Sequence, residues 1–524
     1  MNLSEEAHPG LARWLVAIAV MSSAVMEVLD TSVVNVSLPH IAGSLSATVD
    51  EATWVLTSYI VANAIILPIT GWLANVIGRK RLLLIVVTGF TLSSMLCGLA
   101  PNLPLLIFFR VMQGTTGGGL QPLSQAVLLE EFPGKERGKA MAFWGLGIVA
   151  APILGPTLGG WITDSFSWRW VFYINLPVGL FSLIMISLFI RDPHYIKRGT
   201  IKVDAIGLGM LAIGMGALQV MLDKGQEEDW FSSRFIISLL VLAVVFLGVF
   251  VVRELRTPDP IVRFRLLRHR NFAAGVSLAW VLGFVLYGSL VLLPLFMQTL
   301  LGWSAQTAGL WTSPRGIGTA LLMPVVGYML GRGWDGRWML TIGFIVTSVA
   351  LFGFSTMTLQ SGTWDIFLHQ IEQGLGMALV FVPLTTLTMD SITKQDTGYA
   401  TSLFSVTRNI GSSMGISFVT TWLARRSQFH QSVLTTHVTP YSLQFQQMVG
   451  QVSNQMSLRG GVDPTTANKQ ALAQIYHMVQ RQASLLSFVE AFRVLAIMFL
   501  LCTALILLMQ KAKRHRDDGG AAAH

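Results

Sequence analysis

The sequence predicts an all-α integral membrane protein with fourteen transmembrane helices, arranged as two parallel six-helix bundles plus an inserted two-helix hairpin. Of the 524 residues, 52% are hydrophobic and only 12% are charged. Soluble proteins carry about 25% charged residues, so this chain has too few polar side chains to cover a water-soluble surface. Its apolar residues form unbroken runs of roughly the twenty residues that cross a bilayer as a helix, rather than the alternating ~10-residue segments of a β-barrel.

We expect fourteen spans in chain order. They cover residues 14–36, 54–77, 81–100, 104–129, 139–163, 170–190, 204–222, 235–253, 272–300, 306–331, 338–358, 364–390, 398–424 and 486–510. The first run is too long for the core of a signal peptide and is followed by no small-residue cleavage site, so we expect it to be retained.

The positions of the basic residues predict the orientation. With the N-terminus in the cytoplasm, most of the 36 Lys and Arg residues fall in cytoplasmic segments, including residues 79–81 and six arginines in 253–270. Cytoplasmic loops of membrane proteins carry such an excess, so we expect both termini in the cytoplasm. The net charge of +9 then reflects topology. A nucleic-acid partner is not expected.

The two ends of the chain repeat one pattern. Leu67–Gly71 resembles Met323–Gly327, 256 residues later, and Gln113-Gly114 recurs as Gln373-Gly374, 260 residues later. Two parallel halves around a central cavity are the plan of a transporter that rocks between two states. We therefore expect an N-terminal bundle (1–191), an inserted hairpin with cytoplasmic linkers (192–271), a C-terminal bundle (272–510) containing a helical hairpin outside the membrane (425–485), and a cytoplasmic tail (511–524).

Two carboxylates lie in the first span. Glu27 and Asp30 are three residues apart and so share a helical face. Burying two ionised carboxylates together is costly, so we expect at least one to hold a proton near neutral pH. Arg110 of span four lies at the same depth, roughly 9 Å from the outer boundary. We expect it to pair with Asp30, either for proton coupling or as a structural ion pair.

Further polar residues in the spans are candidates for lining a substrate cavity, because charge inside a membrane is usually functional. They are Asn35, Gln125, Arg315, Glu372 and Arg408. Span five carries small residues and prolines that make a helix thin and bendable. We expect its Gly145, Gly155, Pro156 and Gly159 to act in conformational switching, together with Gly71, Gly78 and Arg79 after span two.

Several segments resemble the major facilitator superfamily: L-D-T-S-V-V-N-V-S-L-P (29–39), R-V-M-Q-G (110–114) and G-L-G-I-V-A-A-P-I-L-G-P-T-L-G-G (145–160). The segment W-R-W-V-F-Y-I-N-L-P-V-G (168–179) resembles its fourteen-span drug:proton antiporters, in particular the EmrB-type multidrug exporters of Gram-negative bacteria. The resemblance implies proton transfer through Asp30 and Arg110, and a loop at 71–81 that holds the halves together. Asn75 stands where the family usually has an aspartate, which puts the expected charge pair of that loop in doubt.

The resemblance implies a proton-coupled antiporter of the bacterial inner membrane that exports hydrophobic toxic compounds. It would be driven by the proton gradient without a cofactor, and it would work with a periplasmic adaptor and an outer-membrane channel. The 425–485 segment is then either the docking surface for the adaptor or a cap over the cavity. The alternatives are a proton symporter for a small nutrient, or a receptor or channel that transports nothing by this cycle. The sequence has no phosphate-binding loop and no zinc motif, so we expect neither an enzyme nor a metal site.

Overall fold

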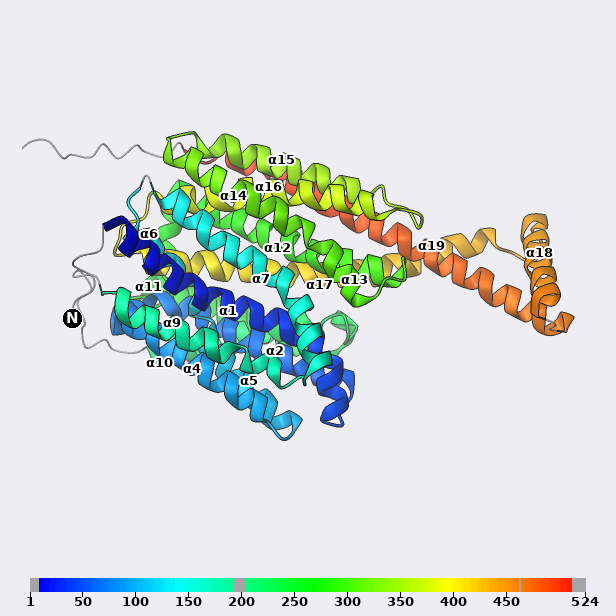
Figure 1. The fold of residues 1–524 in the computed structure, drawn as a ribbon, viewed down its shortest axis with the longest axis horizontal. Coiled ribbons are helices and arrows are strands. Elements are labelled where there is room, and N and C mark those ends of the chain that lie inside the picture. Colours follow the sequence, from blue (N-terminus) through cyan, green and yellow to red (C-terminus); the bar gives the residue numbers. More distant parts are fainter. Residues whose placement is uncertain (1–8, 135, 193–203, 461–462, 511–524) are drawn as a thin grey trace, which may run out of the picture.

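A computed structural model describes residues 9–134, 136–192, 204–460 and 463–510. All the regular structure in these ranges is helical, as the sequence predicts. Most long helices run side by side along one axis, and α18 lies beyond one end of them (Figure 1). We call this end the α18 end. The opposite end, where α1 begins and where Arg79, Arg137 and Arg263 lie, is called the basic end.

The described residues form twenty α-helices and three short 3-10 helices. In chain order they are α1 (Pro9–Ser44), α2 (Val49–Ile66), η1 (Leu67–Ile69), α3 (Thr70–Ile77), α4 (Arg79–Leu99), α5 (Leu103–Gly117), α6 (Leu120–Glu131), α7 (Arg137–Ser165), α8 (Trp170–Tyr173), α9 (Asn175–Phe189), α10 (Ala205–Lys224), η2 (Trp230–Ser232), α11 (Arg234–Arg256), η3 (Phe264–Arg268), α12 (Arg270–Thr299), α13 (Ala305–Thr312), α14 (Pro314–Gly331), α15 (Gly336–Phe354), α16 (Thr363–Met389), α17 (Thr397–His437), α18 (Leu443–Gly460), α19 (Pro464–Leu501) and α20 (Thr503–Ile506).

Eleven helical segments of the described chain are long and apolar enough to cross a membrane. The other three predicted runs are also helical, but two are divided into two helices each and the third is less apolar. Run 104–129 is divided at Gly118 and Gly119 into α5 and α6, and run 306–331 is divided at Ser313, just before Pro314. Run 398–424 lies within the unbroken α17, which is rich in serine and threonine and therefore less apolar.

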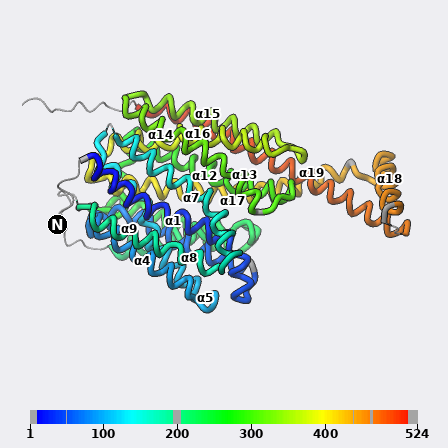
Figure 2. The backbone as a smooth tube through the Cα atoms, viewed as in Figure 1, coloured from blue at the N-terminus to red at the C-terminus, as the bar shows by residue number. Residues whose placement is uncertain are grey.

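The two ends of the chain pack by the same scheme. In the first, α1 contacts α7 and α9, α4 contacts α5 and α9, and α2 contacts α5. In the second, α12 contacts α17 and α19, α15 contacts α16 and α19, and α14 contacts α16. These pairings correspond one to one in chain order, and the tube view shows the two groups side by side (Figure 2).

Glycines bring the two groups into backbone contact toward the basic end. A Cβ atom at Gly71 of α3 would overlap the carbonyl oxygen of Gly398 of α17. A Cβ at Gly327 of α14 would lie 2.8 Å from the carbonyl oxygen of Gly138 of α7. The two contacts are equivalent in the internal repeat, because Gly71 corresponds to Gly327 and Gly138 to Gly398.

The inserted helices α10 and α11 pack on each other, and α10 also contacts α2 and α17. The carboxylate of Asp223 accepts a hydrogen bond from Thr57 of α2. On the α17 side, Gln219 donates to Ser413 at 2.8 Å. At the basic end, Arg253 donates to Asp204 at 2.8 Å.

The 425–485 segment contains the end of α17, the whole of α18 and the start of α19, and α18 packs against α19. α17 continues to His437, α18 follows, and α19 begins at Pro464. Asp463 caps the start of α19, because Thr466 N donates to its Oδ2 at 3.0 Å. α19 then runs without interruption into the last apolar run, because no residue inside it breaks the helix.

Candidate functional site

Asp30 of α1 and Arg110 of α5 form an ion pair inside the first helical group. Arg110 Nη1 lies 2.6 Å from Asp30 Oδ2, and both side chains are fully buried. The distance is that of a charge-assisted hydrogen bond. The structure therefore brings together the two residues that the sequence places at equal depth.

Four further groups surround this pair. Gln113 Nε2 and Asn175 Nδ2 donate to Asp30 Oδ1 at 2.9 and 2.7 Å. Arg110 Nε donates to the carbonyl oxygen of Val55 at 3.0 Å, and its guanidinium lies 4.1 Å from the ring centroid of Tyr59. Asp30 thus receives donors from α5 and α9. A buried carboxylate is stable only when its oxygens are satisfied in this way.

Glu27 lies on the same helix but in a different environment. Its Oε1 accepts a hydrogen bond of 2.8 Å from Asn63 of α2. Its buried Oε2 accepts no hydrogen bond from the described residues. Glu27 nonetheless interacts electrostatically with Gln121 and Arg408, and Arg408 donates to Gln121 Oε1 at 2.6 Å. Glu27 therefore connects the first helical group to α17 of the second.

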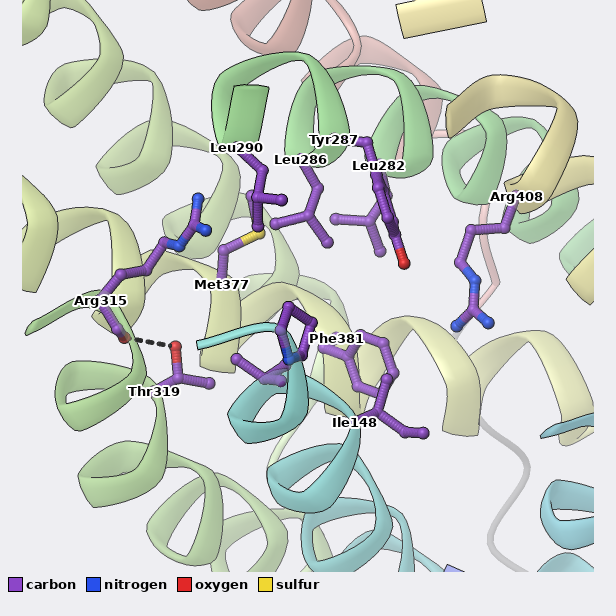
Figure 3. Close-up of a pocket in the computed structure, with 12 residues that line it drawn as sticks. Ile148, Leu282, Leu286, Tyr287, Leu290, Arg315, Thr319, Met377, Phe381 and Arg408 are labelled. Carbon is purple, nitrogen blue, oxygen red and sulfur yellow. Dashed lines mark hydrogen bonds between the residues drawn. The ribbon is translucent and has the colours of Figure 1, made fainter. Parts of the chain in front are cut away.

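A central cavity lies where the two groups meet (Figure 3). The cavity is narrow in this conformation, with a volume of about 40 Å³. The lining is mostly apolar and comes from α7, α12, α14, α16 and α17: Ile148, Val149, Pro152, Leu282, Leu286, Tyr287, Leu290, Arg315, Thr319, Met377, Phe381 and Arg408.

Two arginines supply the positive charge of this cavity and lie on opposite sides of it (Figure 3). Arg315 is only 5% exposed, and its guanidinium has no hydrogen-bond or ion-pair partner among the described residues. A buried cation without a counter-charge is unfavourable by several kcal/mol. The arrangement therefore suits an apolar ligand that carries a negative group.

The predicted switch residues of α7 lie at close helix contacts. A Cβ at Gly145 would lie 2.9 Å from the ring of Phe381, and one at Gly159 would lie 2.9 Å from the carbonyl oxygen of Val33. Gly155 lies equally close to α1, and Pro156 is inside the helix. These contacts fit the prediction of a thin, closely packed helix.

Arg79 lies at the basic end rather than near the cavity. It forms an ion pair with Glu130 of α6, and its Nη2 lies 3.5 Å from the carbonyl oxygen of Lys394, in the connection before α17. Gly78 has a φ of +96°, where side chains other than glycine are strained. The segment 71–81 therefore contacts the second helical group through Arg79.

Three predicted cavity residues do not line the central cavity. Glu372 lies 3.0 Å from His369 Nδ1 on its own helix, α16, because the two are one turn apart. Asn35 is exposed on α1. Gln125 is buried on α6, and neither polar atom of its side chain has a hydrogen-bond partner in the described part of the chain.

The sequence reasoning missed the amides that surround the carboxylates. Gln113 follows Arg110 by three residues and so lies on the same face of α5. Asn175 and Asn63 are isolated polar residues in apolar runs, which is the signal that could have identified them.

Two similarly packed groups of helices with a cavity between them are the architecture of a membrane carrier. The chain belongs to the Major Facilitator Superfamily, whose family model matches residues 20–416. It is therefore a transporter and not an enzyme, and the family predicted from the signature segments is confirmed.

The chain is similar to a multidrug export protein and to a fatty acid resistance protein. It is 43% identical to the multidrug export protein EmrB of Haemophilus influenzae, over 83% of this chain and 85% of that protein. It is 38% identical to the fatty acid resistance protein FarB of Neisseria gonorrhoeae, over 94% of this chain and 95% of that protein. Its fold also resembles the crystal structure of the human organic anion transporter MFSD10, with a TM-score of 0.60 and 14% identity over 94% of this chain and 99% of that one.

Proposed function

We propose that the chain is a proton-coupled antiporter that exports hydrophobic toxic compounds. The observation that carries this proposal is the fully buried pair of Asp30 and Arg110, with Glu27 one turn away on the same helix. Asp30 and Glu27 are the proton-binding groups, and Arg110 controls the charge of Asp30. Because Glu27 interacts with Gln121 and Arg408, a proton on Glu27 changes the electrostatics at the edge of the central cavity.

The substrates are hydrophobic and negatively charged. The cavity is walled by aliphatic and aromatic side chains, and its charged groups are Arg315 and Arg408. Arginine is well suited to carboxylates and other oxyanions, because its planar guanidinium can donate two parallel hydrogen bonds. The similarity to FarB, a fatty acid resistance protein, supports a substrate of this class.

The chain crosses the bacterial inner membrane fourteen times, with both termini in the cytoplasm. The three runs that are broken or polar count as spans, because each pairs with an apolar helix of its own group. The basic end is the cytoplasmic end, in line with the excess of Lys and Arg there. The N-terminal bundle, the inserted hairpin and the C-terminal bundle keep the boundaries given from the sequence.

The glycine contacts at the basic end close the cytoplasmic side in this conformation. Gly71 and Gly398 must separate when the halves rock, as must Gly138 and Gly327. Gly145, Gly155, Pro156 and Gly159 let α7 bend during this motion, and Gly78 and Arg79 hold the closed state.

The 425–485 segment docks a periplasmic adaptor, which connects the exporter to an outer-membrane channel. α18 packs against α19 and projects away from the helical body, which favours docking over a cap on the cavity (Figure 1). Met448 is 48% exposed and Leu458 is 86% exposed, so apolar side chains of α18 remain available to a partner.

The test is transport in vesicles that contain the purified protein. An imposed proton gradient should drive accumulation of 8-anilinonaphthalene-1-sulfonate, a hydrophobic anion that stays ionised. An ionophore that collapses the gradient should abolish the accumulation. Transport that continues without a proton gradient would contradict the proposal.

A further inference from the structure

A second cavity lies between α7 and α14, and we call it the lateral mouth. Its walls include Ala150 and Leu154 of α7, and Ile317 and Ala320 of α14, and no charged side chain lines it. Leu154 is 53% exposed and Ile317 is 51% exposed, although both lie in helices of a membrane-spanning bundle. Their surroundings in the cell are therefore lipid chains.

The lateral mouth adjoins the central cavity. Val149 of α7 and Thr319 of α14 line both spaces. Ile153 and Gly316 line the lateral mouth, and a Cβ at Gly316 would overlap the Cδ1 atom of Ile153. Val149 and Thr319 therefore form the wall that the lateral mouth shares with the cavity of the two arginines.

The internal repeat provides a matched surface on the opposite side of the molecule. Ile317 and Leu321 of α14 correspond to Val61 and Ile65 of α2, 256 residues earlier. Leu321 is 69% exposed. Val61 and Ile65 are instead covered by α10, since a Cβ at Gly216 would lie 3.7 and 3.6 Å from them.

The same contrast holds for the other wall. Ile153 and Leu154 of α7 correspond to Ser413 and Met414 of α17, 260 residues later. Ser413 accepts a hydrogen bond of 2.8 Å from Gln219 of α10, and Met414 packs in the apolar cluster of α10 and α11. The inserted hairpin therefore covers one of two equivalent interfaces and leaves the other facing lipid.

We propose that the lateral mouth is the entrance through which an amphiphilic anion passes from the bilayer into the central cavity. Its apolar chain slides between α7 and α14, and its charged group moves past Ile153 to Arg315. This inference rests on the proposed export of hydrophobic anions. It adds that the substrate comes from the membrane, on one side of the molecule only.

A transport experiment tests whether the mouth is used. In the lateral mouth, Ala320→Trp fills the space, while the neighbouring Leu321→Trp places the same ring on the outer lipid-facing surface. With dansyl-labelled dodecyl sulfonate in the vesicle membrane, Ala320→Trp should reduce proton-driven transport several-fold, and Leu321→Trp should leave it unchanged. Equal transport by both variants would overturn the proposed entrance, and failure of the wild-type protein to move the probe would contradict the proposed function instead.

A labelling experiment tests the mouth without any transport. After Cys97→Ala and Cys502→Ala, single substitutions Ala150→Cys and Ile410→Cys place thiols at equivalent positions of the open and the covered interface. In reconstituted vesicles, N-dodecylmaleimide should label the cysteine at position 150 several-fold faster than the one at position 410. Equal rates, or faster labelling at position 410, would overturn the asymmetry on which the inference depends.

Discussion

Asp30 accepts hydrogen bonds from two other helices. Its ionised state therefore depends on how the helices of the first bundle pack. Arg110, Gln113 and Asn175 all donate to it. A proton on Asp30 would weaken its attraction to Arg110, since the charge assistance is lost. The amides can keep their hydrogen bonds. Protonation therefore acts mainly on the position of one guanidinium.

We predict that Asp30→Asn abolishes proton-driven transport and destabilises the protein. The substitution leaves the buried Arg110 cation without its partner, and breaking a buried pair in this way costs about 3–5 kcal/mol. The double variant Asp30→Asn with Arg110→Gln removes both charges and should recover much of the thermal stability. It should still fail to couple transport to protons. Coupled transport in either variant would show that Asp30 is not the proton carrier.

We also predict that Arg315→Gln weakens binding of 8-anilinonaphthalene-1-sulfonate by roughly 10- to 100-fold, because a hydrogen bond to a charged group contributes about 1.5–3 kcal/mol. Binding of the cation ethidium should not weaken. Arg268→Gln, at the basic end, serves as the control and should change neither affinity. Equal loss for the anion and the cation would indicate damage to the cavity rather than loss of a specific charge.

Much of the ion-pair site was predictable because two simple rules suffice: charged residues are rare in spans, and depth follows from counting residues. The role of Asn175 was not predictable, since nothing in its local sequence says which helix α9 meets. Glu372 failed as a cavity residue for a similar reason. A depth can be counted along a helix, but the direction in which a side chain points depends on which helices surround it.

At the scale of single helices, the fold depends on positions where backbones touch. The break between α5 and α6 coincides with consecutive glycines, and α14 begins at Pro314, so both are local effects that the residues explain. The sequence predicted the apolar runs but not these interruptions, because an apolar run does not reveal whether one helix or two fills it. It also did not predict that α17 and α19 would extend beyond the membrane without a break.

We predict that Gly71→Ala prevents closure at the basic end. The added methyl group would overlap the carbonyl oxygen of Gly398, so α3 and α17 cannot approach as they do here. Gly209→Ala in α10 is the matched control, because nothing lies within 4 Å of its Cβ position. In vesicles, the first variant should lose transport of the anionic dye and the second should keep it. Normal transport by Gly71→Ala would mean that this contact is not part of the cycle.

At the scale of the whole molecule, orientation decides which way substrate moves. We predict that the α18 end faces the periplasm. Tyr441 is 94% exposed there, so in a background with Cys97→Ala and Cys502→Ala, the single change Tyr441→Cys should react with a membrane-impermeant maleimide once the outer membrane is permeabilised. Trp338→Cys, 71% exposed near the start of α15 at the basic end, should react only after cell lysis. The reverse pattern would invert the topology.

The 425–485 segment can be tested as a unit. Replacing it with a short Gly-Ser linker should leave proton-driven transport in vesicles intact but should remove the resistance that the protein gives to cells. Most connections between helices are short, so the bundle itself does not require this segment. Altered transport in vesicles would favour the cap, and full resistance in cells would exclude both roles.

α19 is one continuous helix from Pro464 to Leu501, about 57 Å long at 1.5 Å per residue. Arg426 of α17 donates two hydrogen bonds to Glu490 of α19, at 2.6 and 2.7 Å, where both helices leave the bundle. The projecting end is thus a stiff lever fixed to the second half alone. In the proposed transport cycle, rocking of that half would move the tip of the lever, and a protein bound to the tip would slow the cycle.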